Sequence, residues 1–223
     1  VLAALLPDEF VALDLACGPG AISQRLLARF PRARCVAVDL DPLLLTMGQA
    51  TLGDAEGRLR WVTADLTEPG WIDALGEPAF DAVLSTTALH WLPVEPLVRL
   101  YRDLGRIVRP EGLVLNGDHL AFAPDQPTFR LLAAAAADRQ HEAAFAAGGT
   151  ESWDAWWAAL AEEPGAADLL AERARRFAGK TGHDGGEPAP IFDVHAAALR
   201  DAGFREVGVV WQRLDDRVLL GVR

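Results

Sequence analysis

Short apolar runs recur along the first half of the chain, and amphipathic stretches separate them. The first run, residues 11–15, is apolar except for Asp14, and similar runs lie within 33–42, 59–66 and 80–92. A nearly continuous apolar run of this length is typical of a strand that is buried on both faces of a parallel sheet. The pattern therefore predicts four buried strands in these stretches.

The segments between the apolar runs show the spacing of helices. Apolar side chains recur at helical intervals in residues 21–30 before Pro31, and Asp41-Pro42 is typical of a helix N-cap followed by the first helical residue. A continuous apolar stripe predicts a further helix over 94–108. The stripe consists of Val94, Leu97, Val98, Tyr101, Leu104 and Val108. Strand and helix thus alternate up to residue 117, which predicts right-handed crossovers and a parallel sheet.

The composition changes over residues 118–192. An alanine-rich helical stretch (128–147) is followed by Gly148-Gly149 and by a helix with three tryptophans within five residues. Another helical stretch (166–179) leads into a Gly/Pro-rich segment (180–190), which predicts a surface loop. We expect one domain over 1–223, in which 118–192 is a helical cap inserted over the substrate between the fifth strand and the last helix.

A turn of small residues follows the first strand and leads into the first helix. Such a turn lets a ligand approach the backbone and the amides at the helix start. Gly18 and Gly20 match the first two glycines of the dinucleotide pattern G-x-G-x-x-G, but Ser23 stands at the third position. The stretch instead resembles motif I of the class I S-adenosylmethionine-dependent methyltransferases. Asp14, Ala16, Gly18 and Gly20 fall on its four positions, and Ala16 stands where the family has a glycine.

Further landmarks of the same family follow in order. Asp39 ends the second apolar run about 20 residues beyond the glycines, where a carboxylate can accept both ribose hydroxyls. Asp65 ends the third run, where the family commonly places an acid that binds the adenine amino group. The loop within 80–92 resembles the N-x-A-L-H-W stretch of trans-aconitate-type small-molecule methyltransferases. Residues 106–120 resemble the family's entry into its fifth strand, and 204–223 resemble its closing antiparallel hairpin.

The resemblance implies an α/β, Rossmann-like fold, with seven mostly parallel strands, an antiparallel final strand and helices on both faces of the sheet. It also implies S-adenosyl-L-methionine as cofactor and S-adenosyl-L-homocysteine as product. The residues expected at the cofactor are Asp14, Ala16, Cys17, Gly18, Gly20, Asp39, Leu40, Asp65, Leu66 and Ser85.

The acceptor side is expected beyond the fourth and fifth strands. His119, next to Asp118, is the first candidate for a base, and His90 is expected to hold the acceptor through a hydrogen bond. Trp91, Trp153 and Trp157 are the candidate residues for contact with apolar parts of the substrate. Methyl transfer to an acceptor without a proton needs positioning alone, so a base is not required by the reaction itself.

The composition disfavours two classes of partner, nucleic acids and membranes. A net charge of −11 disfavours a phosphate-backbone partner, and no run reaches the ~18–20 apolar residues of a bilayer span. No signal peptide is recognised, the two cysteines lie too far apart in the predicted strands to bridge, and no Cys/His cluster has metal spacing. We expect a cytoplasmic monomer or homodimer that acts on a small molecule, with no metal, nucleic acid or membrane partner.

The predicted function is methyl transfer to a small-molecule acceptor, with oxygen slightly preferred as carboxylate or hydroxyl. Ser85-Thr86-Thr87-Ala88 stands where methyltransferases of amino groups carry an N-P-P-Y type tetrapeptide. One alternative is an NAD(P)-dependent oxidoreductase, which Ser23 and Asp65 disfavour. The other is a module that binds S-adenosylmethionine without catalysis.

Overall fold

Seven strands form one sheet in a computed structural model of the chain, which describes residues 1–146, 151–180 and 189–223. The strands are β1 Val11–Leu15, β2 Arg34–Asp39, β3 Leu59–Thr63, β4 Phe80–Thr86, β5 Val108–His119, β6 Glu206–Arg213 and β7 Asp216–Val222. Their order is β3-β2-β1-β4-β5-β7-β6, and β7 runs antiparallel to both of its neighbours. The predicted Rossmann-like sheet with an antiparallel final strand is confirmed.

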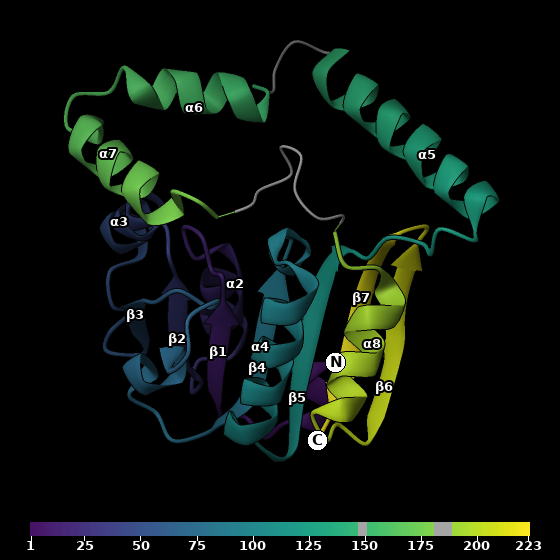
Figure 1. Cartoon of the computed structure of the whole chain (residues 1–223). Coiled ribbons are helices and arrows are strands. Elements are labelled where there is room, and N and C mark those ends of the chain that lie inside the picture. The colour runs from purple at the N-terminus through teal and green to yellow at the C-terminus, as the bar shows by residue number, and fades with distance from the viewer. Residues whose placement is uncertain (147–150, 181–188) are drawn as a thin grey trace.

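Helices cover both faces of this sheet (Figure 1). The helices are α1 Leu2–Leu5, α2 Ala21–Arg29, α3 Pro42–Leu52, α4 Val94–Ile107, α5 Pro127–Ala146, α6 Trp153–Ala161, α7 Ala166–Phe177 and α8 Phe192–Asp201, with short 3-10 turns η1 Trp71–Leu75 and η2 Leu89–Trp91. As predicted, α2 ends before Pro31 and Asp41 caps α3, its carboxylate accepting from the amides of Leu43 and Leu44. These local signals place the helix starts beside the ends of β1 and β2.

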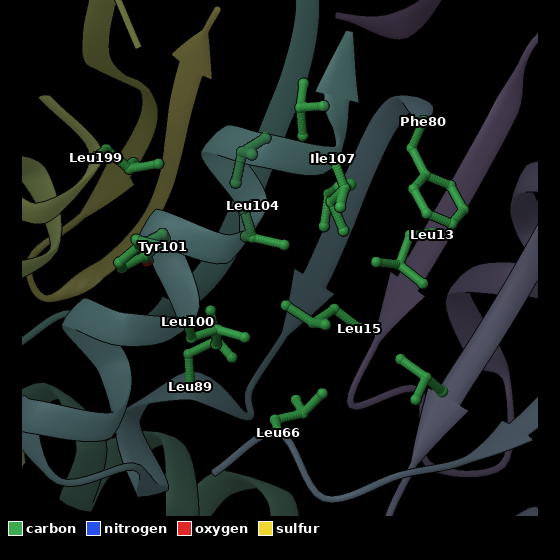
Figure 2. Close-up of a cluster of buried hydrophobic side chains, with 14 of the residues drawn as sticks. Leu13, Leu15, Leu66, Phe80, Leu89, Leu100, Tyr101, Leu104, Ile107 and Leu199 are labelled. Carbon is green, nitrogen blue, oxygen red and sulfur yellow. The ribbon is translucent and has the colours of Figure 1, made fainter. Parts of the chain in front are cut away.

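The larger hydrophobic core lies between the sheet and α4. Figure 2 shows Leu13 and Leu15 of β1 on the same side as Leu100, Tyr101 and Leu104 of α4, and all five are fully buried. Burying one leucine completely contributes about 1.5–3 kcal/mol. This packing fixes where the strands end.

The apolar stripe predicted for α4 is shifted in the structure. Val94, the first residue of α4, is exposed, whereas Leu100 is buried although the prediction left it out. The reason is that Leu97, Leu100 and Leu104 follow one another at intervals of three and four residues, which keeps them on one helix face.

The fifth strand is longer than predicted. We expected it to end near Gly117 and to present Asp118 and His119 together, but β5 continues to His119 because it pairs with β7. Successive residues of a strand point to opposite faces of the sheet. Asp118 is therefore buried, whereas His119 is exposed. The carboxylate beside the His119 ring is therefore that of Asp216 and not that of Asp118, and the inserted segment follows His119.

The segment between β5 and α8 forms the helices α5, α6 and α7, which lie beyond the C-terminal ends of the parallel strands (Figure 1). Several large apolar side chains of α5 are exposed, among them Phe129, Leu131 and Leu132. Gly148-Gly149 and most of the Gly/Pro-rich segment 180–190 lie outside the described residues.

Candidate cofactor and acceptor site

The turn after β1 uses a left-handed backbone at three positions. The φ angles are 53° at Ala16, 52° at Gly18 and 84° at Gly20. Glycine adopts this region freely, but it costs a residue with a Cβ about 1–2 kcal/mol. Ala16, which stands where the family has its first glycine, is thus strained. The sequence alone does not show this strain, because it does not give φ.

Close packing leaves no room for a side chain at position 20. A Cβ there would lie 2.6 Å from the ring of Trp61 in β3, and a Cβ on Gly48 of α3 would lie 2.4 Å from the same ring. Gly18 differs, because the nearest atom to a Cβ at that position is a methyl of Leu44 at 3.9 Å. The ring of Trp61 therefore packs tightly against the turn at Gly20, whereas the space that a Cβ at Gly18 would occupy is not filled by side chains of the described residues.

Asp14 supports this loop from inside the protein. Its carboxylate accepts from the amide of Ser23 at 2.8 Å and from the hydroxyl of Ser23 at 2.6 Å, and its residue is 1% exposed. Burial raises the pKa of Asp14 to about 6, although the two bonds from Ser23 oppose the shift. Sequence reasoning treated Ser23 as a missing glycine and overlooked its role as the partner of Asp14. The signal was available, since a serine in the first turn of a helix can donate to an acid at the preceding strand.

Asp39 joins the end of β2 to the glycine turn. Its carboxylate accepts from the amide of Gly18 at 2.7 Å and from the amide of Asp41 at 2.9 Å. Burial raises the pKa of this carboxyl, and the backbone bonds partly oppose the shift. The structure therefore brings together the glycine turn and the acid predicted for the ribose.

Cys17 and Ser85 tie the loop to its neighbouring strands. The amide of Cys17 donates to the carbonyl of Val38 at 3.0 Å, and the hydroxyl of Ser85 donates to the carbonyl of Leu15 at 2.9 Å. Ser85 is the second-to-last residue of β4, and the strand order reverses between β1 and β4. Open α/β sheets bind ligands at such a reversal. Burial raises the pKa of the Cys17 thiol well above its usual range, which keeps the thiol protonated.

Asp65, at the end of the third apolar run, is partly buried beside Leu66. Its carboxylate accepts from the amide and hydroxyl of Thr67 at 2.9 and 2.6 Å, and it forms an ion pair with Lys180. Burial acts to raise its pKa, but the bonds from Lys180 and Thr67 outweigh burial and lower it.

Basic residues around the end of α7 contact the loops that follow β2 and β3. Arg173 forms an ion pair with Asp41 at 2.5 Å, and Arg176 donates to the carbonyl of Leu40 at 3.1 Å. Lys180 adds its contact with Asp65. Sequence reasoning missed all three, because each joins positions more than 100 residues apart. No local pattern signals such a contact.

The two candidate histidines have different carboxylate partners. Nδ1 of His90 lies 2.5 Å from Asp118, which is 4% exposed and also accepts from the His90 amide at 3.0 Å. Burial acts to raise the pKa of Asp118, but the bonds from His90 outweigh it and hold that pKa below its usual value. Nδ1 of His119 lies 2.6 Å from Asp216 of β7, and the two imidazole rings are 5.7 Å apart.

The candidate tryptophans occupy two places. The ring of Trp91 lies 5.1 Å from that of His90, and Trp91 is about half exposed. On α6, Trp153 contacts Trp156 and Trp157 at ring distances of 5.4 and 5.6 Å, as their spacing predicts. Trp157 also stacks on the guanidinium of Arg173 at 4.2 Å.

Two absences among the described residues bear on the site. No three His, Cys, Asp or Glu side chains there are placed to hold a metal ion. Among the described helices, none is both long and apolar enough to cross a membrane.

The chain is similar in sequence to known methyltransferases. A family model described as a methyltransferase domain matches residues 12–112. The chain is 35% identical over 129 residues to a trans-aconitate 2-methyltransferase of Methylobacterium radiotolerans, a match that covers 57% of this chain and 44% of that protein. It is 32% identical over 105 residues to a malonyl-[acyl-carrier protein] O-methyltransferase of Legionella pneumophila, covering 46% of this chain and 34% of that protein.

A solved structure extends the likeness to the rest of the fold. The apo crystal structure of the S-adenosylmethionine-dependent methyltransferase SibL matches with a TM-score of 0.57 at 21% identity, over 96% of this chain and 50% of that chain. At this identity the likeness concerns the fold. The matches to these two curated relatives cover less than half of the length of each relative.

Proposed function

We propose that this chain, which belongs to the class I S-adenosylmethionine-dependent methyltransferases, transfers a methyl group from S-adenosylmethionine to a small-molecule acceptor. The observation that carries the proposal is the link between Asp39 and Gly18, at 2.7 Å, beside the strand reversal. It sets an acid and an open glycine turn side by side, as a nucleoside with a charged tail requires.

The residues around this link fit such a cofactor. A side chain at position 18 would project into space that the turn leaves open. Asp39 would bind the ribose hydroxyls, Asp65 the adenine amino group, and Leu40 and Leu66 the faces of the adenine ring. Asp14, Ala16, Cys17, Gly20 and Ser85 hold the turn in shape. When bound, S-adenosylmethionine supplies an electrophilic methyl group on its sulfonium.

The acceptor is proposed to be an oxygen, most simply a carboxylate. One curated relative is named for O-methylation of malonyl-[acyl-carrier protein] and another for methylation of trans-aconitate. An ionised carboxylate carries no proton to remove, so positioning supplies most of the catalysis. A hydroxyl acceptor would need a base.

We assign that base to His90, and His119 becomes the second candidate. The contact of Nδ1 with the buried Asp118 fixes the orientation of the His90 ring. Proton transfer would then pass through Nε2. His119 is paired with Asp216 on a more exposed part of the sheet, so its ring is less tightly fixed.

The helices α5–α7 are proposed to cap the acceptor within a single domain of residues 1–223. Trp91, Trp153 and Trp157 would contact its apolar part. The cap and the acidic surface suit a small molecule and disfavour nucleic acid. The free, buried thiols of Cys17 and Cys35 suit a reducing cytoplasm, where the protein would act as a monomer or homodimer.

Calorimetry tests the cofactor assignment. S-adenosylhomocysteine should bind, NAD should not, and Asp39→Ala should weaken binding by roughly tenfold or more, because two charge-assisted hydrogen bonds are lost. Asp39→Asn keeps one acceptor oxygen and controls for damage to the loop. NAD binding, or unchanged affinity in Asp39→Ala with its fold intact, would refute the assignment.

Turnover tests the base. A panel of small acids and alcohols is assayed for S-adenosylhomocysteine release at saturating cofactor. With a hydroxyl acceptor, His90→Ala should lower kcat by ~10²–10⁴, while His119→Ala should have a smaller effect. The reverse order would restore His119 as the base, and full turnover in both variants would leave positioning as the whole mechanism. Binding of S-adenosylhomocysteine without turnover of any acceptor would favour a non-catalytic module.

A further inference from the structure

Arg217 of β7 is a buried cation that has no carboxylate partner among the described residues. It is 6% exposed, and its guanidinium carbon lies 4.4 Å from the ring centre of Phe122 and 4.5 Å from that of Phe192. Its Nε donates to the carbonyl of Leu214 at 3.3 Å, and no ion pair joins it to a described residue. Aromatic rings attract the positive charge but offer no lone-pair acceptor to the Nη groups.

A guanidinium in this position is costly to bury. Burial lowers the pKa of Arg217, and the more distant carboxylates of Asp215 and Asp193 only partly oppose the shift. A buried charge is normally paired, because the loss of hydration is otherwise uncompensated. Arg217 therefore lacks the partner that would compensate its burial.

Arg217 also lines a cavity of about 250 Å³. The other lining side chains that matter here are Phe122 and Gln126 from the start of the cap, Phe192 and Asp193 of α8, and Gln212 of β6. A volume of this size exceeds that of a few waters, each of which takes about 30 Å³. It can hold a small organic acid.

The register of the sheet places Arg217 opposite the acid that contacts the proposed base. Arg217 lies directly opposite Asp118 in the β5–β7 ladder, and paired residues of neighbouring strands share one face of the sheet. Asp118 in turn holds His90. Arg217 thus lies one strand away from the His90–Asp118 pair, on the side of the sheet that ends at β6.

We propose that Arg217 binds a carboxylate group of the acceptor in this cavity, and this assignment rests on the proposed function. A guanidinium matches a carboxylate with two parallel hydrogen bonds. Asp193 in the cavity wall repels a second negative charge, so a monoanionic carboxylate fits better than a phosphate. Arg217 would then determine specificity by holding the end of the acceptor that does not react.

Three probes test the charge and the shape of the ligand on the full chain: benzoate, its neutral isostere benzamide, and inorganic phosphate. Calorimetry or NMR titration should detect benzoate binding, with weaker binding of phosphate and none of benzamide. Equal binding of benzamide would refute the role of charge. Tighter binding of phosphate would refute the carboxylate class, and no binding of benzoate to the wild type would overturn the proposal.

Variants locate the site. Arg217→Met should weaken benzoate binding about tenfold or more, whereas Arg213→Met on β6, an exposed arginine that bonds to Gln140, should not. Asp193→Asn should strengthen binding several-fold, which keeps the proposal testable if Arg217→Met does not fold. Unchanged affinity in both Arg217→Met and Asp193→Asn would refute the site.

S-adenosylhomocysteine binding, measured on the same proteins, separates the two proposals. It should be equal in wild type, Arg217→Met and Arg213→Met. If the wild type binds benzoate but not S-adenosylhomocysteine, the proposed function fails while the carboxylate site stands.

Discussion

The glycine turn after β1 and the inserted helices α5–α7 both lie beyond the C-terminal ends of the parallel strands (Figure 1), and the region of α7 contacts the loops after β2 and β3. Different forces hold the turn and the helices. The turn is fixed by buried carboxylates that accept from nearby backbone and hydroxyl groups, as Asp14 does from Ser23 and Asp39 from Gly18. The helices keep large apolar side chains exposed and reach the same strand ends through arginine and lysine. We therefore expect the turn to be a rigid part of the domain and the helices to open separately from it.

The tight packing of the turn predicts the largest effect. Gly48→Ala places a methyl group 2.4 Å from the ring of Trp61 and 2.9 Å from the carbonyl of Pro19, so ring or backbone must move. We expect a loss of about 2–4 kcal/mol in unfolding free energy, even though alanine favours a helix by up to ~1 kcal/mol. Chemical denaturation measures it.

Gly208 of β6 provides the matched control, because a Cβ there meets no atom within 4 Å. Gly208→Ala should change stability by less than about 1 kcal/mol. Equal losses in the two variants would contradict the view that the packing around Trp61 sets the cost.

Protonation of Asp14 gives the next largest effect. Its pKa is about 6 in the folded protein against 3.8 for the ordinary carboxyl, so between these values the folded state binds more protons. The wild type should therefore lose about 2–3 kcal/mol of stability from this group as pH rises from 4 to 6. Asp14→Asn removes this pH dependence. The unfolding free energy of the wild type should therefore fall relative to that of the variant as pH rises from 4 to 6.

Glu172 on α7 is the contrasting acid. Bonds from Arg176 and Arg175 lower its pKa, so its contribution has the opposite sign and is lost as pH falls. Because Glu172 lies at the surface, where solvent screens its ion pairs, Glu172→Gln should leave the curve almost unchanged between pH 4 and 6. A shift as large as that of Asp14→Asn would contradict the contrast between the two regions.

This contrast also separates what the sequence predicts from what it does not. The first four strands, the end of α2 before Pro31 and the cap of α3 at Asp41 depend on residues a few positions apart, so periodicity and capping chemistry were enough to predict them. The last three strands were expected from the family resemblance instead. The glycine turn and Asp39 follow from spacing in the same way.

Contacts across the fold were not predictable from local patterns. Asp118 contacts His90, 28 residues away, because β4 and β5 are neighbours in the sheet. The pairing of β5 with β7, which begins about 100 residues later, extends the strand to His119 and so places its side chain on the opposite face. The contacts of Arg173 and Lys180 likewise depend on the packing of α7 against α3, which brings together residues more than 100 positions apart. The strain at Ala16 was undecided because a sequence does not give φ.

Breaking the link between the two regions should have a local effect. Arg173→Met removes the ion pair with Asp41 and the stacking on Trp157 and Phe177. Such contacts contribute about 0.5–1 kcal/mol each, so amide exchange in α6 and α7 should become roughly fivefold to thirtyfold faster. Hydrogen exchange with mass spectrometry measures it.

Arg175 is the matched arginine, since its guanidinium bonds to Glu172 within the same helix. Arg175→Met should leave α6 exchange nearly unchanged, and neither variant should alter exchange in residues 16–20. Faster exchange of the turn in Arg173→Met would show that the two regions open together.

The smallest expected effect concerns strain inside the rigid region. Ala16 holds φ at 53°, which costs about 1–2 kcal/mol, whereas glycine adds about 0.5–1 kcal/mol of unfolded-state entropy. Ala16→Gly should therefore raise stability by about 0.5–1 kcal/mol. Ala55, with φ of 47° before β3, should respond alike, whereas Ala28→Gly on the exposed face of α2 should cost about 1 kcal/mol. Equal destabilisation by all three substitutions in thermal unfolding would mean that the turn carries no strain at Ala16.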